Sequence, residues 1–472
     1  MKSNCLTFGQ PPLRLALISA VFFIVAVVFY GIVWQNAPIL APDSGSYLRA
    51  ARDLSDFHID ELQERTPGYP LLLVVTGSQD SPNKALFFVS LFLHFASISM
   101  LSYGLYEPGV KEWAIYLFML TLLLPPFVEP AAYVLTEVLA ALLLTAAVVS
   151  FYLWYLHDQK RWLLCSSIAT GCAALTRPAY QLLAIAFVLY LITIRFVDPI
   201  ASLSWKKVRD ASFFLIGGSV LIIGGYAFYN LRSFGHFTVT PKLGLTLSVK
   251  TARIVERLPD KYQTLRDTLV KARDEELLRD PTHRGSMYIW AAVPVLTNLT
   301  GLAPADLSDY MLWINLRLIL KAPLTYLQEV AWAFVDYWFP ASGELSAFGS
   351  RSVQAIWAVV HFCVMAAFWA SLVLLFGAAT LGCSIASAKG TTIFFDGMVD
   401  RFCKGTFLYG LAGVTIGYSA LVSSLLEVGD PRYRVPTDPL ITFMAVIGWQ
   451  EWFWLVSRAR TIARPPIWES AE

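Results

Sequence analysis

Charge is scarce in this chain of 472 residues. Asp, Glu, Lys and Arg together make up 15% of the residues and hydrophobic residues make up 56%, whereas charged residues account for about 25% of a typical soluble domain. Much of the surface must therefore face something other than water. The net charge of +2 is close to balance, so the composition gives no indication of a nucleic-acid partner.

Several signatures of functional sites are also absent from the sequence. The six cysteines lie in or beside apolar segments, apart from Cys5 in the N-terminal tail, and their positions indicate neither a disulfide framework nor a metal site. The segments expected on the outer side of the membrane contain no Asp-x-Asp pair. The chain also shows no His/Glu metal spacing, Gly-x-Ser-x-Gly turn or Walker loop. We therefore expect neither a metal ion nor a cofactor.

Long apolar segments recur along the chain. Their recurrence predicts an all-α polytopic membrane protein with about 10–12 transmembrane helices, because about 20 apolar residues cross a hydrocarbon core of about 30 Å. The first segment is too long for a signal peptide and lacks a small-x-small cleavage site, so we expect it to be retained. The expected spans are 13–34, 85–106, 113–127, 131–156, 162–175, 178–196, 213–229, 353–381, 406–426 and 440–456.

The loops between these segments predict the orientation of the chain. Basic residues follow the even-numbered spans, as in 157–162, 195–210 and 387–405, and they share a side with Lys2 and Arg14. Cytoplasmic loops carry an excess of Lys and Arg, so this side is expected to be cytoplasmic. The opposite, outer side then receives the loops 35–84, 125–133, 176–180 and 427–438 and the long stretch 231–350.

Some segments are expected to lie at the membrane surface or outside it. The apolar segment 69–77 is too short to cross and is expected to dip into the membrane edge. The aromatic segment 326–340 carries acidic residues, so we expect it to be interfacial. The outer stretch contains two helix candidates, 260–279 and 306–321. We find no internal repeat.

Asp43 lies near the start of the stretch APDSGSYLRAARDL, just outside the first span, and two interpretations remain open for it. It is placed to cap a helix whose apolar face carries Tyr47, Leu48 and Ala51. A serine three positions later means that there is no capping box. Alternatively, Asp43 is a carboxylate near the membrane plane that accepts a proton from an acceptor hydroxyl. Composition alone favours the cap.

Four arginines are expected on the same outer face. Arg65 precedes a Pro-Gly turn, Arg177 is the sole cation of the short hairpin 176–180, and Arg432 and Arg434 follow the ninth span. Positive charge on the outer side opposes the orientation rule. Guanidinium groups bind phosphate well, so the set indicates an anionic partner; contact with lipid headgroups is the alternative.

Three more outer-side residues are candidates for the same pocket. Glu129 and Glu137 lie at the outer ends of the third and fourth spans, and Glu137 is about two turns inside its expected helix. An ionised carboxylate there needs a partner or a polar cavity, so either an ion pair or a substrate pocket would explain it. His236 is expected in a surface loop, with substrate contact as the alternative.

Six segments in this order resemble the GT-C superfamily of membrane glycosyltransferases. The resemblance is to bacterial members related to protein O-mannosyltransferases and lipid A aminoarabinose transferases, and it covers most of the chain. Each motif is loose by itself, but the ordered set on one membrane side is specific. The segments are 42–54, 65–73, 133–139, 173–180, 319–330 and 431–440.

The resemblance implies a GT-C fold with three parts. Residues 1–230 would form a seven-span catalytic module with the first outer loop at 35–84. Residues 231–350 would form an outer, periplasmic helical insert, and residues 351–472 a C-terminal part of three spans. The implied location is the bacterial inner membrane, with a cytoplasmic N-terminus and an active site on the periplasmic side.

The resemblance also implies the reaction and the residues that carry it. The enzyme would move a sugar from a polyprenyl-phosphate carrier to a hydroxyl of a glycan, lipid A or protein, with inversion and with Asp43 as general base. The donor phosphate and sugar would be bound by Arg65, Tyr69, Arg177, Arg432, Tyr433 and Arg434, and further pocket residues would be Tyr47, Glu129, Glu137 and His236.

Departures from the family pattern and rival functions are part of this prediction. Asp43-Ser44 replaces the Asp-Glu pair usual in protein O-mannosyltransferases, which argues against a protein acceptor more than against the reaction. Rival functions are a transporter or flippase, a non-enzymatic scaffold of polysaccharide assembly, and a polymerase or ligase of lipid-linked oligosaccharides. A transporter would show repeats and charges near mid-membrane, whereas the charges here gather at one face.

Overall fold

The structure, a computed structural model, describes residues 13–56, 65–106, 110–197, 203–279, 281, 286–339, 351–389 and 393–463. Cys5, Lys2 and the basic tail beyond residue 463 lie outside the described residues. Within the described part the chain is helical, and its one extended pairing is an isolated parallel bridge between Ile39 and Tyr133.

The α-helices of the first half are α1 (Leu13–Val33), α2 (Ser44–Ser55), α3 (Gly68–Val75), α4 (Lys84–Tyr106), α5 (Glu112–Leu122), α6 (Pro125–Val128), α7 (Glu137–His157), α8 (Lys160–Thr176), α9 (Leu183–Val197) and α10 (Trp205–Phe234). Those of the second half are α11 (Leu243–Thr251), α12 (Gln263–Arg279), α13 (Tyr288–Thr300), α14 (Pro304–Lys321), α15 (Pro323–Tyr337), α16 (Arg351–Lys389), α17 (Ile393–Leu426) and α18 (Asp438–Ala463). The short 3₁₀ helices are η2 (Glu129–Ala131), η3 (Pro178–Tyr180), η4 (Ala252–Arg257), η5 (Asp260–Tyr262), η7 (Pro431–Tyr433) and η8 (Val435–Thr437).

Long apolar helices make up the body of the molecule. Within the described residues, seven helices are long and apolar enough to cross a membrane, and an eighth crossing is formed if the bent pair α5–α6 is counted as one span. The other two expected spans correspond to α8, which has 17 residues, and to α18. The chain is a multi-pass, all-α membrane protein, as expected. The predicted total of about ten spans stays a prediction.

The third span is bent for a reason that the sequence carries. Its two helical pieces, Glu112–Leu122 and 125–131, meet at an angle of 69°. Pro125 and Pro126 stand at the bend. Proline has no backbone N–H and clashes with the preceding turn, so the chain cannot continue straight here. The bend directs Glu129 and the segment after it towards the first outer loop.

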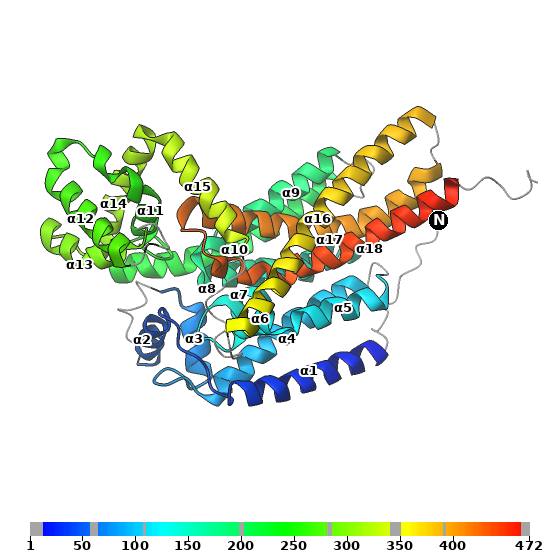
Figure 1. Ribbon diagram of the computed structural model, residues 1–472, viewed down its shortest axis with the longest axis horizontal. Coiled ribbons are helices and arrows are strands. Elements are labelled where there is room, and N and C mark those ends of the chain that lie inside the picture. Colours follow the sequence, from blue (N-terminus) through cyan, green and yellow to red (C-terminus); the bar gives the residue numbers. More distant parts are fainter. Residues whose placement is uncertain are drawn as a thin grey trace, which may run out of the picture.

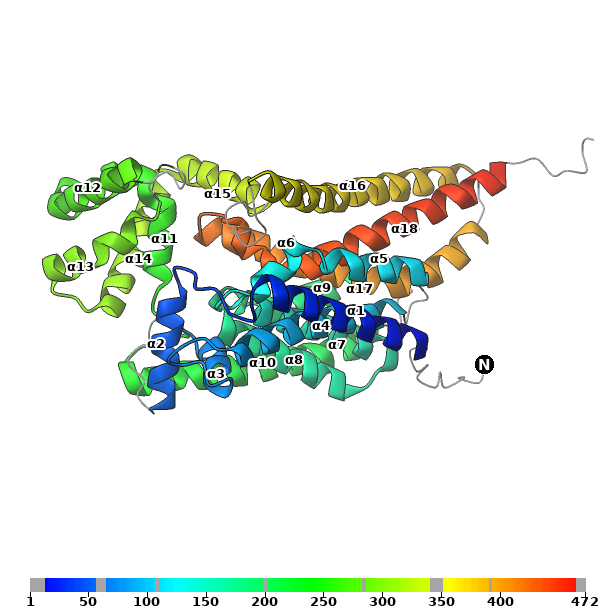
Figure 2. The same cartoon turned by 60° about the horizontal axis from the view of Figure 1, so that its bottom comes forward.

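The outer elements gather at one end of the molecule. The insert helices α11–α14 and the short helices α2 and α3 lie at the same end in two views, whereas α1 begins at the opposite end (Figures 1 and 2). Helix α3 has eight residues, about 12 Å of rise, which is too short to cross. The expected positions of 69–77 and of the insert relative to the membrane stay predictions.

The insert 231–350 has a hydrophobic core of its own within its described part. Leu265 and Leu269 of α12 are buried there, together with side chains of α11, α13 and α14. The predicted helices 260–279 and 306–321 correspond to η5 with α12 and to α14. Helix α14 ends at Lys321, and Pro323 begins α15, where its missing N–H costs nothing. Several large apolar side chains of α15 are exposed, as an interfacial helix requires.

Candidate functional site

Asp43 occupies the N-cap position of α2 but does not cap it. The side chain makes no capping hydrogen bond, and the residue has helical backbone angles. Its carboxylate instead binds two arginines. Arg65 Nη2 donates to Oδ1 at 2.8 Å, and Arg432 Nη1 lies 3.0 Å from Oδ2. The structure thus gives Asp43 a role other than the cap that composition favoured.

Backbone contacts fix Asp43 against the loop between α6 and α7. The Ile39 amide donates to the Ala132 carbonyl at 2.7 Å, and the Val134 amide donates to the Ile39 carbonyl at 2.9 Å. One turn later, Ser44 Oγ donates to the Val134 carbonyl at 2.9 Å. The segment from Ile39 to Ser44 is therefore held beside the start of α7, although the two segments are about 90 residues apart in sequence.

Arg65 reaches Asp43 because its own loop is docked on two helices. Its Nε donates to Ser46 Oγ at 2.8 Å and its Nη1 donates to the Tyr47 hydroxyl at 3.3 Å, both on α2. The guanidinium lies 4.4 Å from the centroid of the Tyr47 ring, a cation–π geometry. The next residue, Thr66, donates its hydroxyl to the Thr176 carbonyl at the end of α8, at 3.1 Å.

A second carboxylate extends the cluster into the protein. Arg432 Nε donates to Glu137 Oε1 at 2.6 Å, and Arg177 Nη1 lies 3.6 Å from the same oxygen. Glu137 is the first residue of α7, where the partial positive charge of the helix N-terminus also favours an anion. Its side chain is 2% exposed. The structure therefore shows the ion pair expected for Glu137; its place in a substrate pocket stays a prediction.

We call Asp43, Arg65, Glu137, Arg177 and Arg432 the charged cluster. Burial alone would raise the pKa of Asp43, but the Arg65 and Arg432 guanidiniums outweigh it and hold the pKa of this carboxyl below its usual range. Asp43 is therefore ionised at neutral pH. Three guanidiniums face the two carboxylates of the cluster. The cluster carries one positive charge in excess and suits an anion.

Three buried polar atoms in and beside the cluster have no hydrogen-bond partner. They are Arg177 Nη1, Glu137 Oε2 and the hydroxyl of Tyr69, whose ring packs edge-on against that of Tyr47. Buried polar groups are nearly always hydrogen-bonded in native proteins. The unsatisfied donors and acceptor therefore indicate that the site takes a ligand rich in oxygen and hydroxyl groups.

Tyr433, Glu427 and Lys250 line the inner side of the cluster. The Arg177 guanidinium lies 5.4 Å from the centroid of the Tyr433 ring, and the Tyr433 hydroxyl donates to Glu427 Oε2 at 3.3 Å. Burial raises the pKa of Glu427 to about 7. Lys250 of α11 is buried and donates to the Glu329 carbonyl at 3.3 Å. Glu427 and Lys250 were not predicted; the position of Glu427 directly after the ninth span was the available signal.

Arg434 lies in a separate buried network. Its Nε donates to Asp438 Oδ1 at 3.0 Å, and its Nη1 donates to the carbonyls of Tyr337 and Phe339 at 2.8 and 2.7 Å. Its Nη2 lies 2.9 Å from His361 Nε2. The side chain is fully buried and four of its five N–H groups are used. The expected place of Arg434 in the donor pocket is therefore not the one observed.

Glu129 and His236 lie outside the charged cluster. Glu129 is buried in η2, within the loop that binds the first outer segment. His236 Nε2 and Nδ1 lie 3.5 Å from carboxylate oxygens of Asp306 and Asp309 on α14, so this histidine makes its contacts within the insert. Among the described residues, no group of three or more His, Cys, Asp or Glu side chains is placed to hold a metal ion.

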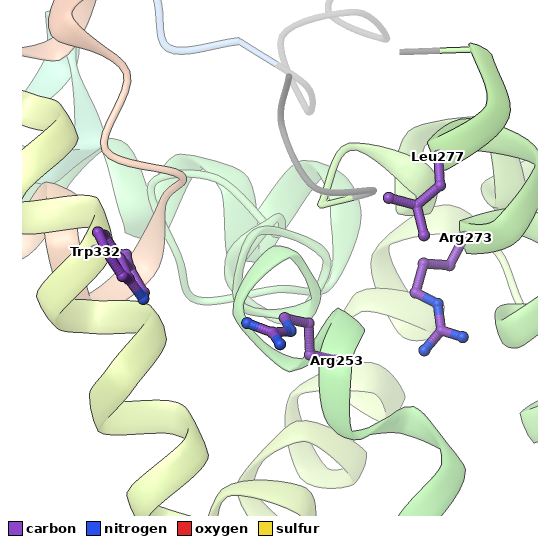
Figure 3. Close-up of a pocket in the computed structure, with 4 residues that line it drawn as sticks. All are labelled: Arg253, Arg273, Leu277 and Trp332. Atoms are coloured by element: carbon purple, nitrogen blue, oxygen red, sulfur yellow. The ribbon is translucent and has the colours of Figure 1, made fainter. Parts of the chain in front are cut away.

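A cavity of about 510 Å³ opens within the insert region. Trp332 of α15 lies on one side, Arg273 and Leu277 of α12 lie on the other, and Arg253 of η4 lies between them (Figure 3). Both arginines already have acidic partners, as Arg253 binds Glu329 at 2.7 Å and Arg273 binds two carboxylates. The cavity therefore lacks the excess positive charge of the cluster at Asp43.

Comparison with known families identifies the chemistry of the chain. Residues 73–240 match the family model described as dolichyl-phosphate-mannose-protein mannosyltransferase. This stretch runs from α3 to the start of the insert and contains Glu137 and Arg177. It forms a domain of this glycosyltransferase family, which confirms the expected enzyme class and the resemblance seen in the sequence.

Comparisons with curated proteins and with solved structures give no further assignment of function. No curated protein matches the chain significantly. Among solved structures, the chain is similar to the crystal structure of ArnT from Cupriavidus metallidurans bound to undecaprenyl phosphate, with 13% identity and a TM-score of 0.38 over 92% of this chain and 78% of the other. A TM-score this low assigns no role to any residue of this chain.

Proposed function

We propose, for a chain whose residues 73–240 belong to the dolichyl-phosphate-mannose-protein mannosyltransferase family, that the charged cluster is the active site of a polyprenyl-phosphate-dependent glycosyltransferase. The enzyme transfers a sugar from the lipid carrier to a hydroxyl group of an acceptor, with inversion at the anomeric carbon. The acceptor is a glycan, lipid A or another lipopolysaccharide component, or a protein. The reaction takes place on the outer face of a bacterial inner membrane, and it needs no metal ion.

One observation carries this proposal. Asp43, 39% exposed, lies at the open edge of a cluster in which Arg65 and Arg432 hold its two oxygens at 2.8 and 3.0 Å. Behind it, Arg177 Nη1 and Glu137 Oε2 are buried without hydrogen-bond partners. A carboxylate near a guanidinium donor that lacks a hydrogen-bond partner has the two groups that a transfer from a phosphate carrier needs: a base and an anion site.

The donor's charge fits the cluster. A sugar joined to a polyprenyl phosphate is a phosphodiester with one negative charge, and the cluster carries one positive charge in excess. Arg177 donates to the phosphate through Nη1, which has no hydrogen-bond partner in the free protein, and Tyr69 donates its hydroxyl to the phosphate or the sugar. The carrier's apolar tail stays in lipid beside the helices. The donor is therefore bound through its phosphate, with little need for protein contacts to the tail.

Donor binding also changes Asp43. In the free protein its two arginine partners hold its pKa below the usual range, which makes it a weak base. When the phosphate enters, Arg65 and Arg432 turn part of their donors towards the new anion, and the carboxylate becomes more basic. The same arginines thus keep Asp43 ionised before binding and release it for proton transfer afterwards.

The chemical step then follows. The acceptor hydroxyl attacks the anomeric carbon, the bond from that carbon to the phosphate oxygen breaks, and Asp43 takes the hydroxyl proton. The bonding electrons stay on the phosphate, so the leaving polyprenyl phosphate gains a second negative charge. Arg65, Arg177 and Arg432 stabilise that developing charge, which is the main electrostatic contribution to the rate.

Release of the carrier from labelled donors tests the proposal. Purified protein in lipid nanodiscs is given a panel of undecaprenyl-phosphate-linked hexoses and pentoses with extracted envelope glycans and lipids as acceptors. We expect the wild type to release undecaprenyl phosphate from at least one donor. Asp43→Asn should lower this turnover on the order of a thousandfold, because it removes the base.

Asp53→Asn is the matched control on the same helix α2. It removes one carboxylate from the region without touching the charged cluster, so its turnover should stay within about twofold of the wild type. Full activity of Asp43→Asn would contradict its assignment as base. If the wild type released no carrier from any monophosphate donor but acted on pyrophosphate-linked oligosaccharides, the ligase or polymerase alternative would take its place.

A further inference from the structure

Glu427 is a half-buried residue whose carboxyl group the reaction described above does not use. The Tyr433 hydroxyl donates to its Oε2 at 3.3 Å, and no ion pair within 4.0 Å joins it to any described residue. Tyr433 in turn lies with its ring beneath the Arg177 guanidinium. Glu427 is thus one side chain away from the arginine that has an unpartnered donor in the donor site.

The backbone around Glu427 is held firmly. Its amide donates to the Ser423 carbonyl at 2.8 Å, which closes the last helical turn at the end of α17. Gly429 follows with a φ of +81°, and a Cβ there would overlap the carbonyl of Ala333 on α15. The carboxyl of Asp430 then accepts from the Arg432 amide at 2.8 Å. The loop that carries Glu427, Arg432 and Tyr433 is therefore fixed by contacts at several points along its backbone.

Charged and titratable groups from four elements face Glu427. Burial is the largest influence and favours the neutral carboxyl, while the Tyr433 hydrogen bond and two nearby cations favour the ionised form, and Asp43 opposes it. The outcome is a pKa of about 7, so both forms are populated near neutral pH. The facing groups are Tyr433 of η7, Arg177 after α8, Lys250 of α11 and Asp43 before α2.

We propose, building on the proposed function, that Glu427 sets the affinity of the site for the donor by its own protonation. While Glu427 is neutral, the arginines present their full excess of positive charge to the phosphodiester. When Glu427 ionises, the net charge around Arg177 falls by one unit and Arg177 is drawn towards Tyr433 and the new carboxylate. Glu427 is a positioning residue in this proposal, because it acts on the donor through Tyr433 and Arg177.

The sign of the effect follows from linkage. An anionic donor binds better to the form of the protein that carries more protons, so donor affinity is highest below pH 7 and falls as the pH rises through about 7. A unit charge about 10 Å away in a medium of effective dielectric constant about 20 changes the binding of a monoanion on the order of tenfold. The phosphodiester itself does not titrate in this range, so it adds no pH dependence.

Equilibrium binding of the donor measures this directly. The probe is radiolabelled mannosyl-phosphoundecaprenol, or the member of the donor panel that binds most tightly, with the full-length protein in nanodiscs from pH 5.5 to 8.5. For the wild type we expect Kd to rise on the order of tenfold across this range, with a midpoint near pH 7. Glu427→Gln, which imitates the neutral carboxyl, should keep the low-pH Kd throughout.

Two other variants should shift the pH midpoint of the rise in donor Kd and should keep the pH dependence itself. Tyr433→Phe removes the hydrogen bond that favours ionised Glu427, and Lys250→Gln removes a nearby cation. Each should shift the rise in Kd to higher pH. Glu275→Gln on the exposed surface of α12 is the charge-matched control and should leave the wild-type profile unchanged. A variant that has merely lost structure would weaken binding at every pH, with no change of midpoint.

The outcomes separate this inference from the proposed function. If the wild type binds the donor equally at all pH values, or Glu427→Gln keeps the wild-type pH profile, the role of Glu427 is overturned while the donor site stands. If the wild type binds no donor of the panel at any pH, the donor assignment itself is contradicted. A flat Glu427→Gln profile at the low-pH affinity, with shifted midpoints in the other two variants, establishes the inference.

Discussion

At the scale of single residues, Arg432 and Arg434 show how closely spaced side chains can differ in role. Both belong to the segment PRYRVP, in which η7 is followed directly by η8. Arg432 reaches Asp43 and Glu137 and is 18% exposed, whereas Arg434 is fully enclosed between the end of α15, His361 and Asp438. The tight turns between them separate the two guanidiniums, so one faces the donor site and the other holds helices together.

Substitution of Arg434 should therefore act on stability, and substitution of Arg65 on binding. Arg434→Gln leaves the buried Asp438 without its guanidinium and should lower the apparent unfolding temperature, as a loss of about 3 kcal/mol would. Arg65→Gln should keep the wild-type unfolding temperature within about 2 °C and weaken donor binding on the order of tenfold. Thermal unfolding in detergent and donor Kd, measured on both variants, check this. The reverse pattern would place Arg434 in the donor pocket after all.

The predicted topology places most residues of the charged cluster on one side of the membrane, but it does not predict which guanidinium pairs with which carboxylate. Asp43, Arg65, Arg177 and Arg432 could be grouped because all follow odd-numbered spans and so face one side. The pairing of each guanidinium with a particular carboxylate depends on loop docking, which has no local sequence signal. Glu427 was not predicted: its position directly after the ninth span indicated its side of the membrane, but its hydrogen bond with Tyr433 has no local sequence signal.

At the scale of elements, two short segments bring the cluster together. Helix α2 packs on α3, with Tyr47 and Tyr69 in edge contact, and the loop before α3 lies on the end of α8. Gly68 makes that approach possible. A Cβ at Gly68 would lie 2.6 Å from Thr176 Oγ1 and 2.8 Å from the Leu175 carbonyl oxygen.

Gly68→Ala should accordingly push the loop off α8. The displaced loop carries Arg65 and Tyr69, so we expect turnover to fall on the order of tenfold or more, together with a loss of stability of about 1–3 kcal/mol from the overlap. Gly45→Ala on α2 is the matched control, since its Cβ would meet nothing closer than Arg49 Nη1 at 3.8 Å. Alanine favours a helix, so this control should retain activity and stability. Equal effects of the two variants would show that loop docking on α8 is not what matters.

The elements themselves were largely predictable. Apolar length and helical periodicity gave the long helices and the two main helices of the insert, since both signals are local. The bend between α5 and α6 follows from Pro125 and Pro126 once the span is known. The backbone pairing of Ile39 with residues 132–134 was not predictable, because an isolated bridge has no hydrophobic pattern of its own.

At the scale of the whole molecule, the insert, α2 and α3 share one end (Figures 1 and 2). This common end is what sets the charged cluster beside Lys250 of the insert. The match of residues 73–240 to a glycosyltransferase family then gives the reaction class. The assignment of this end to the outer side of the membrane rests on the distribution of Lys and Arg in the loops.

Labelling of single cysteines tests the orientation. In a background without the native cysteines, Glu275→Cys on α12 should react with a membrane-impermeant maleimide in intact right-side-out vesicles. Asp158→Cys, in the loop between α7 and α8, should react only after the vesicles are opened, because that loop is expected on the cytoplasmic side. Reaction of Asp158→Cys alone in intact vesicles would reverse the topology and place the charged cluster in the cytoplasm.

The most direct test of the account is the comparison of donor affinity and turnover in Asp43→Asn. If Asp43 is the base and its arginine partners bind the donor phosphate, removing its charge abolishes proton transfer but leaves Arg65 and Arg432 free for the phosphate. We therefore expect turnover to fall on the order of a thousandfold while the donor Kd stays equal to that of the wild type or becomes tighter. A variant that loses donor binding and turnover together, or keeps both, would contradict the account.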